Sequence, residues 1–246
     1  MNDGFHERAR TARRTGYGMI FLGIYLNLPF AALGAVFSYP DILRRPAGEI
    51  LTRFAESGPL LLAIWYAFVL AALALVALAC IARPMARAAA VAGILAGAFQ
   101  AIGLIRWVFV VPVLARAYTA PDATAVTRET AAMVFDALHA FAGVAIGEHL
   151  GQLATAAWAV LFASALRASN HIARWQTHMA QAAAALIVAG LVEGFATVIP
   201  FDPGPWSLAT PVGFLVLSAW MVGVGLTLIR RAGNPSHFPV SIRSNA

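Results

Sequence analysis

Long uncharged, apolar runs alternate along the chain with short segments that carry arginine and acidic residues. A helix needs roughly 20 apolar residues to cross the hydrocarbon core of a bilayer. Five runs meet or approach that length, at residues 15–40, 57–82, 88–105, 175–192 and 203–229. One further run, the fourth of the six in chain order, follows Glu148 and ends near Leu166. The pattern predicts an all-α bundle of six transmembrane helices in one domain, residues 1–232, with a disordered cytoplasmic tail over residues 233–246.

The composition agrees with a polytopic membrane protein. Hydrophobic residues make up 61% of the chain and charged residues only 11%, whereas a soluble domain carries about a quarter charged residues. The net charge of +6 is the balance of 17 arginines and 11 acidic residues, and the arginines lie between the apolar runs rather than on one basic face. That distribution argues against nucleic acid as a partner and indicates the lipid bilayer instead.

The arginines also predict how the bundle is oriented. Eleven precede the first run, join the second to the third and the fourth to the fifth, or follow the sixth: Arg8, Arg10, Arg13, Arg14, Arg83, Arg87, Arg167, Arg174, Arg230, Arg231 and Arg243. The opposite loops carry fewer arginines, which acidic residues offset. Because loops rich in arginine stay in the cytoplasm, both termini are predicted to be cytoplasmic.

Two further helices are expected at the outer surface. Residues 41–57 have apolar positions at roughly helical spacing, which indicates a short amphipathic helix. Residues 128–167 are all helical in character and would extend about 60 Å, twice the hydrocarbon thickness. Such a helix must either project far out of the bilayer or break. Gly143 and Gly147 are the natural break, which predicts an outer cap helix over residues 129–141 and a fourth span over 144–166.

Glycines four residues apart indicate which helices pack together. The spacing occurs in the third, fourth and fifth runs, at Gly93 and Gly97, at Gly143, Gly147 and Gly151, and at Gly190 and Gly194. Small residues at this spacing let membrane helices approach closely. We therefore expect mutual packing of helices three, four and five.

Polar residues inside the predicted helices gather near these glycines. They are Gln100 and Arg106 on helix three, Glu148, His149 and Gln152 on helix four, Glu193 on helix five, and Asp136 and His139 just above them. Trp107 and Tyr66 are expected at the same depth and could line a pocket. Ionisable residues within a membrane indicate a functional site; the alternative is a structural ion pair of Arg106 with Glu148 or Glu193. One arginine cannot neutralise two carboxylates, so a proton, a cation or a protonated histidine is also implied.

Several chemistries are compatible with these residues. His139, Glu148 and His149 are zinc-type ligands, so zinc or another divalent metal is one alternative, although no HxxxH or HExxH spacing occurs. Haem ligation needs paired histidines that face one another across helices. It is less favoured, because His139 and His149 are expected on the outer side of the membrane and His171 and His178 on the inner side. A proton-coupled transporter would use Glu148 and Glu193, yet no internal repeat supports it.

Three segments resemble a known family of bacterial multi-pass membrane proteins, domain-of-unknown-function family 4386. They read TARRTGYGMIFLGIY, AIGLIRWVFVVPVLARAY and FDALHAFAGVAIGEHLGQLATAAW. The most specific parts are Arg106-Trp107 with Pro112, and the Gly147-to-Gly151 segment GEHLG. The resemblance covers nearly the whole chain and implies a six-helix protein of the bacterial inner membrane. It implies no activity, substrate or cofactor.

We therefore expect an outward-facing polar pocket among helices three to five that binds a small ligand or a lipid headgroup. Arg106 would pair with an anion or with Glu148, while Glu193 and His139 exchange protons; Asp136, Gln100, Gln152, Trp107 and Tyr66 would complete the lining. The alternatives are a membrane-embedded metal-dependent enzyme using His139, Glu148 and His149, and a structural or partner-binding subunit. Homo- or hetero-oligomers are compatible with each of these.

Overall fold

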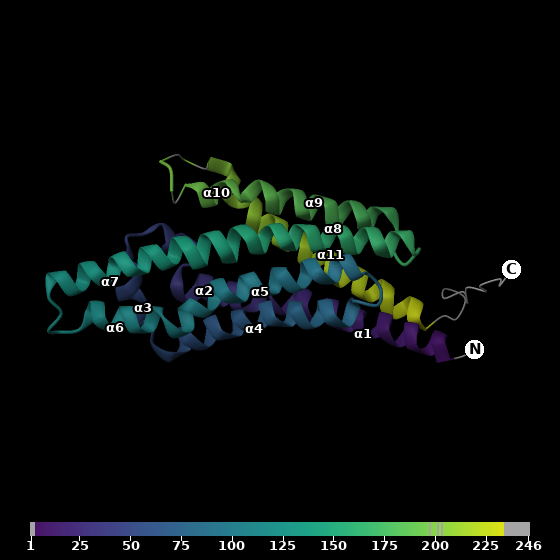
Figure 1. The fold of residues 1–246 in the computed structure, drawn as a ribbon, viewed down its shortest axis with the longest axis horizontal. Helices are drawn as coiled ribbons and strands as arrows, with labels where there is room; N and C mark the ends of the chain where they lie inside the picture. The colour runs from purple at the N-terminus through teal and green to yellow at the C-terminus, as the bar shows by residue number, and fades with distance from the viewer. Residues whose placement is uncertain (1–2, 197, 201, 203, 234–246) are drawn as a thin grey trace.

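The structure is a computed structural model that describes residues 3–196, 198–200, 202 and 204–233. Its described residues form helices and turns, with no strand among them. The predicted disordered tail lies, apart from Gly233, outside the described residues. Figure 1 shows the helices running side by side along the length of an elongated molecule.

Six helical runs in the described part of the chain are long and apolar enough to cross a membrane, which confirms the predicted number. They consist of α1 (Asp3–Tyr25) with α2 (Asn27–Phe37), α4 (Gly58–Ala82), α5 (Arg87–Phe109) with α6 (Val111–Thr119), α7 (Ala125–Leu138) with η2 (His139–Leu150) and α8 (Gly151–Ala168), α9 (Arg174–Gly190) with α10 (Val192–Phe195), and η3 (Gly204–Leu208) with α11 (Ala209–Ala232). Between the first two runs lie η1 (Asp41–Arg44) and α3 (Ala47–Glu56).

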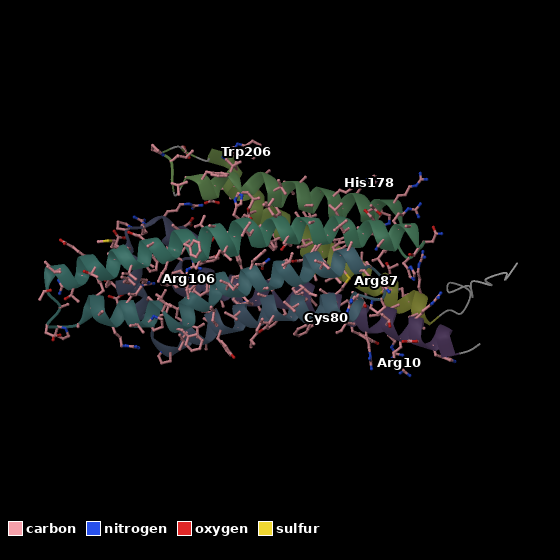
Figure 2. All side chains as sticks on the ribbon, viewed as in Figure 1. Arg10, Cys80, Arg87, Arg106, His178 and Trp206 are labelled. Carbon is pink, nitrogen blue, oxygen red and sulfur yellow. The ribbon has the colours of Figure 1, made fainter. Side chains whose placement is uncertain are left out.

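The first turn of α1 and the last turn of α11 lie at the same end of the molecule, as an even number of spans requires (Figure 1). Arg10 and Arg87 lie toward this end, whereas Arg106 lies in the opposite half (Figure 2). We call the end with Arg10 the basic end and the opposite end the cap end. A cytoplasmic location of the basic end stays a prediction from the arginine distribution.

The cap end holds the short amphipathic helix that the sequence predicts. This helix is α3, and its apolar residues Ile50, Leu51 and Phe54 are buried. It packs against α6 and α7, which extend α5 and η2 toward this end (Figure 1). The apolar side of the helix therefore faces the protein.

The fourth helical run does not break where the sequence analysis placed a break. It continues from Ala125 to Ala168 over 44 residues, about 66 Å at 1.5 Å per residue, and so takes the other predicted alternative of a helix that projects far along the molecule (Figure 1). Residues 139–150 widen into a π-helix instead of ending. Gly143 and Gly147 lie in that widened stretch, where they allow close contacts with α5 rather than a turn.

Glycines bring the backbones of α5 and η2 together. A Cβ atom added to Gly103 would lie 2.6 Å from the Cα atom of Gly147, so the two helices touch at these residues. The chain also packs α8 against both α5 and α9, which confirms two of the three contacts expected from mutual packing of helices three, four and five; in the described part of the chain α5 and α9 are not packed against each other. Gly190, however, faces Thr210 of α11 rather than helix four.

A group of buried aromatic rings packs together around the end of α5 that carries Trp107. The aromatic cluster consists of Phe37, Phe54, Trp65, Trp107 and Phe135. Trp65 and Trp107 stack face to face, with ring centroids 4.5 Å apart, and Phe37 meets both rings edge-on. The cluster joins α2, α3, α4, α5 and α7 and fixes how these elements sit around the end of α5.

Gly103→Ala should destabilise the protein, because the added methyl group overlaps the backbone of Gly147. Overpacking of this kind costs about 1–3 kcal/mol. Gly223→Ala is the matched control, since no atom lies within 4 Å of a Cβ built there, and removing a helical glycine favours folding by about 0.5–1 kcal/mol. Unfolding of both variants in mild detergent measures the difference, and equal stability of the two would contradict the backbone contact.

Candidate functional site

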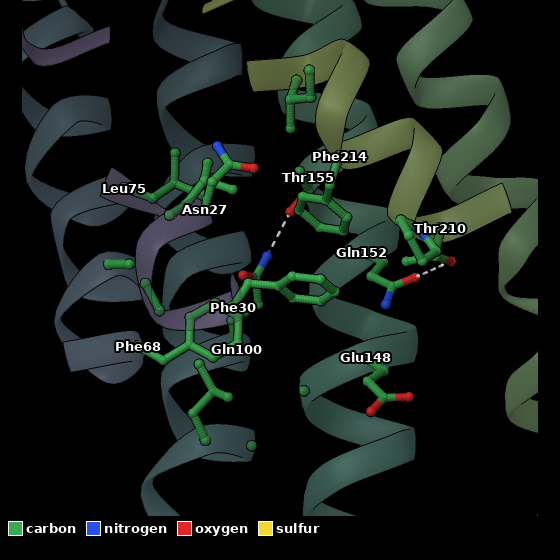
Figure 3. Close-up of a pocket in the computed structure, with 18 of the residues that line it drawn as sticks. Asn27, Phe30, Phe68, Leu75, Gln100, Glu148, Gln152, Thr155, Thr210 and Phe214 are labelled. Carbon is green, nitrogen blue, oxygen red and sulfur yellow. Dashed lines mark hydrogen bonds between the residues drawn. The ribbon is translucent and has the colours of Figure 1, made fainter. Parts of the chain in front are cut away.

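A cavity of about 220 Å³ lies between α1–α2, α4, α5, η2–α8 and α11 (Figure 3). Most of its lining residues are apolar or aromatic. A small polar set interrupts them: Asn27, Tyr39, Gln100, Arg106, Glu148, Gln152, Thr155 and Thr210. Four residues that the sequence analysis assigned to a pocket, Gln100, Arg106, Glu148 and Gln152, meet at one cavity, together with Trp107. The predicted place of the pocket among helices three to five differs, because α9 and α10 contribute none of its described lining residues.

Arg106 is held firmly at the wall of this cavity. Its side chain is 7% exposed, and its guanidinium donates hydrogen bonds to the Gly103 carbonyl and to Nδ1 of His139, the latter at 3.1 Å. Because arginine has no acceptor, Nδ1 of His139 must accept and carries no proton. The guanidinium also lies 5.3 Å from the ring centroid of Trp107 and against Gly143, where a side chain would clash.

His139 connects this arginine to the aromatic cluster. Its ring stacks on Phe135, four residues earlier, with centroids 5.7 Å apart and planes inclined by 5°. The two side chains therefore share the inner face of the helix. His139 was assigned to the pocket; it bonds to Arg106 at the cavity wall but is not among the cavity-lining residues.

Glu148 faces the cavity without a bonding partner among the described residues. It lies one turn before Gln152 on the same helix, as Figure 3 shows. Its carboxylate accepts none of the hydrogen bonds and joins none of the ion pairs found in the described part of the chain, although Arg106 lines the same cavity. Glu148 is thus a carboxyl group of this cavity that no hydrogen bond or ion pair of the described residues engages.

Glu193 pairs with a different arginine from the one expected. Its carboxylate lies 2.5 Å from Arg44 of η1, which also lies 2.5 Å from Asp41. The hydrogen bond with Glu193 raises the pKa of Arg44 above its usual value. Because α9 ends at Gly190 and the chain continues in the short helix α10, Glu193 reaches toward the η1 segment instead of toward Arg106.

Tyr39 is a cavity residue that the sequence analysis missed. It follows α2, lines the cavity and meets Trp65 edge-on at 5.4 Å. Burial raises the pKa of its hydroxyl, and the Glu148 carboxylate adds to that rise. The hydroxyl therefore keeps its proton at neutral pH and offers a hydrogen-bond donor. Its position depends on the path of the irregular segment after α2, and the spacing of residues in the sequence does not predict that path.

Two residues assigned to the pocket point away from it. Tyr66 is 48% exposed, because neighbouring side chains on a helix point about 100° apart and Trp65 takes the inward direction. Asp136 is exposed as well, since Phe135 and His139 occupy the inner face of its helix. In both cases the sequence analysis placed the residue at the right depth but on the wrong face of its helix.

The two glutamines of the cavity are fixed by threonines. Thr155 donates its only hydroxyl hydrogen to the Gly151 carbonyl, so it accepts the bond from Nε2 of Gln100 at 2.8 Å. Thr210 donates to Oε1 of Gln152 at 3.4 Å. These bonds leave the carbonyl oxygen of Gln100 and the amide nitrogen of Gln152 available to a ligand (Figure 3).

The three side chains considered as metal ligands point in different directions. His139 bonds to Arg106, His149 meets the ring of Phe195 at 5.3 Å, and Glu148 faces the cavity. Within the part of the chain that the structure describes, no group of three or more His, Cys, Asp or Glu residues could hold a metal ion.

Fold and cavity define a class: a polytopic helical membrane protein with a largely apolar cavity that carries charged groups at one side. The chain belongs to the family described as domain of unknown function (DUF4386), whose model matches residues 15–225. No curated protein and no solved structure matches the chain.

Glu148→Gln should leave the free energy of unfolding unchanged or raise it, because a half-buried carboxylate without a hydrogen-bond partner costs stability. His139→Ala should lower it by about 1–3 kcal/mol, since a buried guanidinium donor loses its acceptor. Chemical unfolding in mild detergent compares the two variants. A loss in Glu148→Gln as large as that in His139→Ala would show that Glu148 is part of a structural ion pair.

The Arg44–Glu193 pair should contribute little to stability. Both side chains are partly exposed, at 49% and 33%, and exposed pairs typically contribute about 0.2–1 kcal/mol. A double-mutant cycle with Arg44→Ala, Glu193→Gln and the combined variant measures this coupling, which should shrink at high salt. A coupling well above this range would place the pair among the main stabilising interactions.

Proposed function

We propose that this protein binds a small amphipathic molecule in the cavity between α1–α2, α4, α5, η2–α8 and α11. The observation that carries the proposal is the contrast within one cavity: apolar walls on most sides, and an unpartnered carboxylate beside amide and hydroxyl groups on one side. Ligand sites commonly combine an apolar lining with a few placed polar groups.

The apolar walls support a ligand with a hydrophobic body. Side chains from several helices contribute to them, including Leu22, Phe30, Phe68, Leu75, Phe214 and Met221. An engineered apolar cavity of about 150 Å³ admits benzene. A cavity of about 220 Å³ therefore suits a body slightly larger than one aromatic ring, of about ten non-hydrogen atoms in all.

The polar side supports a ligand with one hydrogen-bonding head. Glu148 and the carbonyl oxygen of Gln100 accept hydrogen bonds, and Tyr39 and Gln152 donate them. A polar head that leaves such groups unpaired would be disfavoured, because buried polar groups cost free energy without partners. A lipid headgroup and the polar end of a free small molecule can both supply such a hydrogen-bonding head.

Quenching of tryptophan fluorescence by a brominated probe tests the proposal, because Trp65, Trp107 and Trp158 line the cavity. Para-bromophenethyl alcohol has about the size that the cavity accepts. It should quench saturably in the purified protein. Ala71→Phe, which fills the cavity from α4, should abolish the saturable part.

Ala77→Phe is the matched control, because Ala77 is exposed on the same helix and its replacement adds the same side chain outside the cavity. Its quenching curve should match that of the parent protein. Quenching that never saturates, or that Ala71→Phe leaves intact, would contradict binding in the cavity and favour a structural or partner-binding role.

A further inference from the structure

We infer that the ligand of this cavity is a cation, an arylalkyl- or alkylammonium whose N–H groups bond to Glu148. The inference rests on the proposed function and adds the charge of the head. It depends on three features of the cavity: the free carboxylate, the arginine that is already bonded, and the acceptors beside the carboxylate.

The carboxylate of Glu148 needs a hydrogen-bond donor. A charged group inside a low-dielectric cavity is costly unless it is paired, and the structure gives Glu148 no hydrogen bond or ion pair among the described residues. A ligand ammonium has three donors and a matching charge. A neutral ligand would leave the carboxylate with only the distant compensation of Arg106, which forms no ion pair with it, and a carboxylate ligand would be repelled by it.

Arg106 does not take this role. Its Nη1 donates to the Gly103 carbonyl and its Nη2 to His139, and it lies between Gly143 and the ring of Trp107. Swinging toward Glu148 would break these bonds and leave buried groups unpaired. Arg106 therefore stays at the cavity wall, although its Nε–H group has no hydrogen-bond partner among the described residues.

The surroundings of Glu148 offer further contacts to an ammonium. The carbonyl oxygen of Gln100 is free because the amide nitrogen is held by Thr155. Aromatic rings of Tyr39, Trp65 and Phe68 line the same cavity, and aromatic rings attract cations. The charge of Arg106 opposes a second cation, so we expect a selectivity on the order of tenfold rather than a larger one.

Three probes of one size and different charge test the inference: para-bromophenethylamine, para-bromophenethyl alcohol and para-bromophenylacetate. Tryptophan quenching at neutral pH should show the amine binding about tenfold more tightly than the alcohol, and the acid more weakly than both. In Glu148→Gln the ratio of amine to alcohol affinity should fall close to one. Glu129→Gln, which changes an exposed carboxylate on α7, should keep the parent ratio.

Gln100→Leu provides a second variant should Glu148→Gln fail to fold; it removes one acceptor and should reduce the ratio a few-fold. Equal binding of the three probes, or tightest binding of the acid, would overturn the cationic ligand and leave the proposed function standing. Absence of saturable binding for all three probes would overturn both. An amine preference that survives Glu148→Gln would overturn the role of Glu148.

Discussion

A guanidinium buried within a membrane bundle needs hydrogen-bond acceptors, and the arrangement around Arg106 follows from that need. Gly103 supplies a carbonyl from the same helix, and His139 supplies a ring nitrogen from the neighbouring one. Gly143 leaves room for the flat group. Because its two terminal nitrogens are bonded here, Arg106 forms no ion pair with Glu148 among the described residues, although the two groups influence each other electrostatically, and the carboxylate remains available at the cavity.

The helix that carries His139 and Glu148 also has an unusual course. Residues 139–150 form a π-helix between two α-helical segments, and π-helical stretches within α-helices are frequent at functional sites. Within this stretch Gly147 touches Gly103 while Gly143 meets Arg106. The aromatic cluster supports this region from the cap end, through the stacking of Phe135 on His139.

Hydropathy and glycine spacing were sufficient to predict the six spans, the packing of α8 against α5 and α9, and the approach of Arg106, Glu148, Gln100 and Gln152 to one another. These features depend on helical periodicity, which a sequence displays. The pairing of Glu193 with Arg44 and the position of Tyr39 depend on the path of irregular segments. The outward directions of Tyr66 and Asp136 depend on which face of each helix is turned toward the protein. The continuity of the fourth run depends on whether its glycines widen the helix into a π-helix or break it.

The most direct measurement is the position of bromine in crystals grown with para-bromophenethylamine, located by anomalous diffraction. The account predicts a bromine peak among the apolar walls near Phe68 and Phe214, with the amine nitrogen within hydrogen-bond distance of Glu148 and Arg106 still bonded to His139. A peak confined to the outer surface of the helices, or a Glu148 carboxylate paired with Arg106, would contradict it.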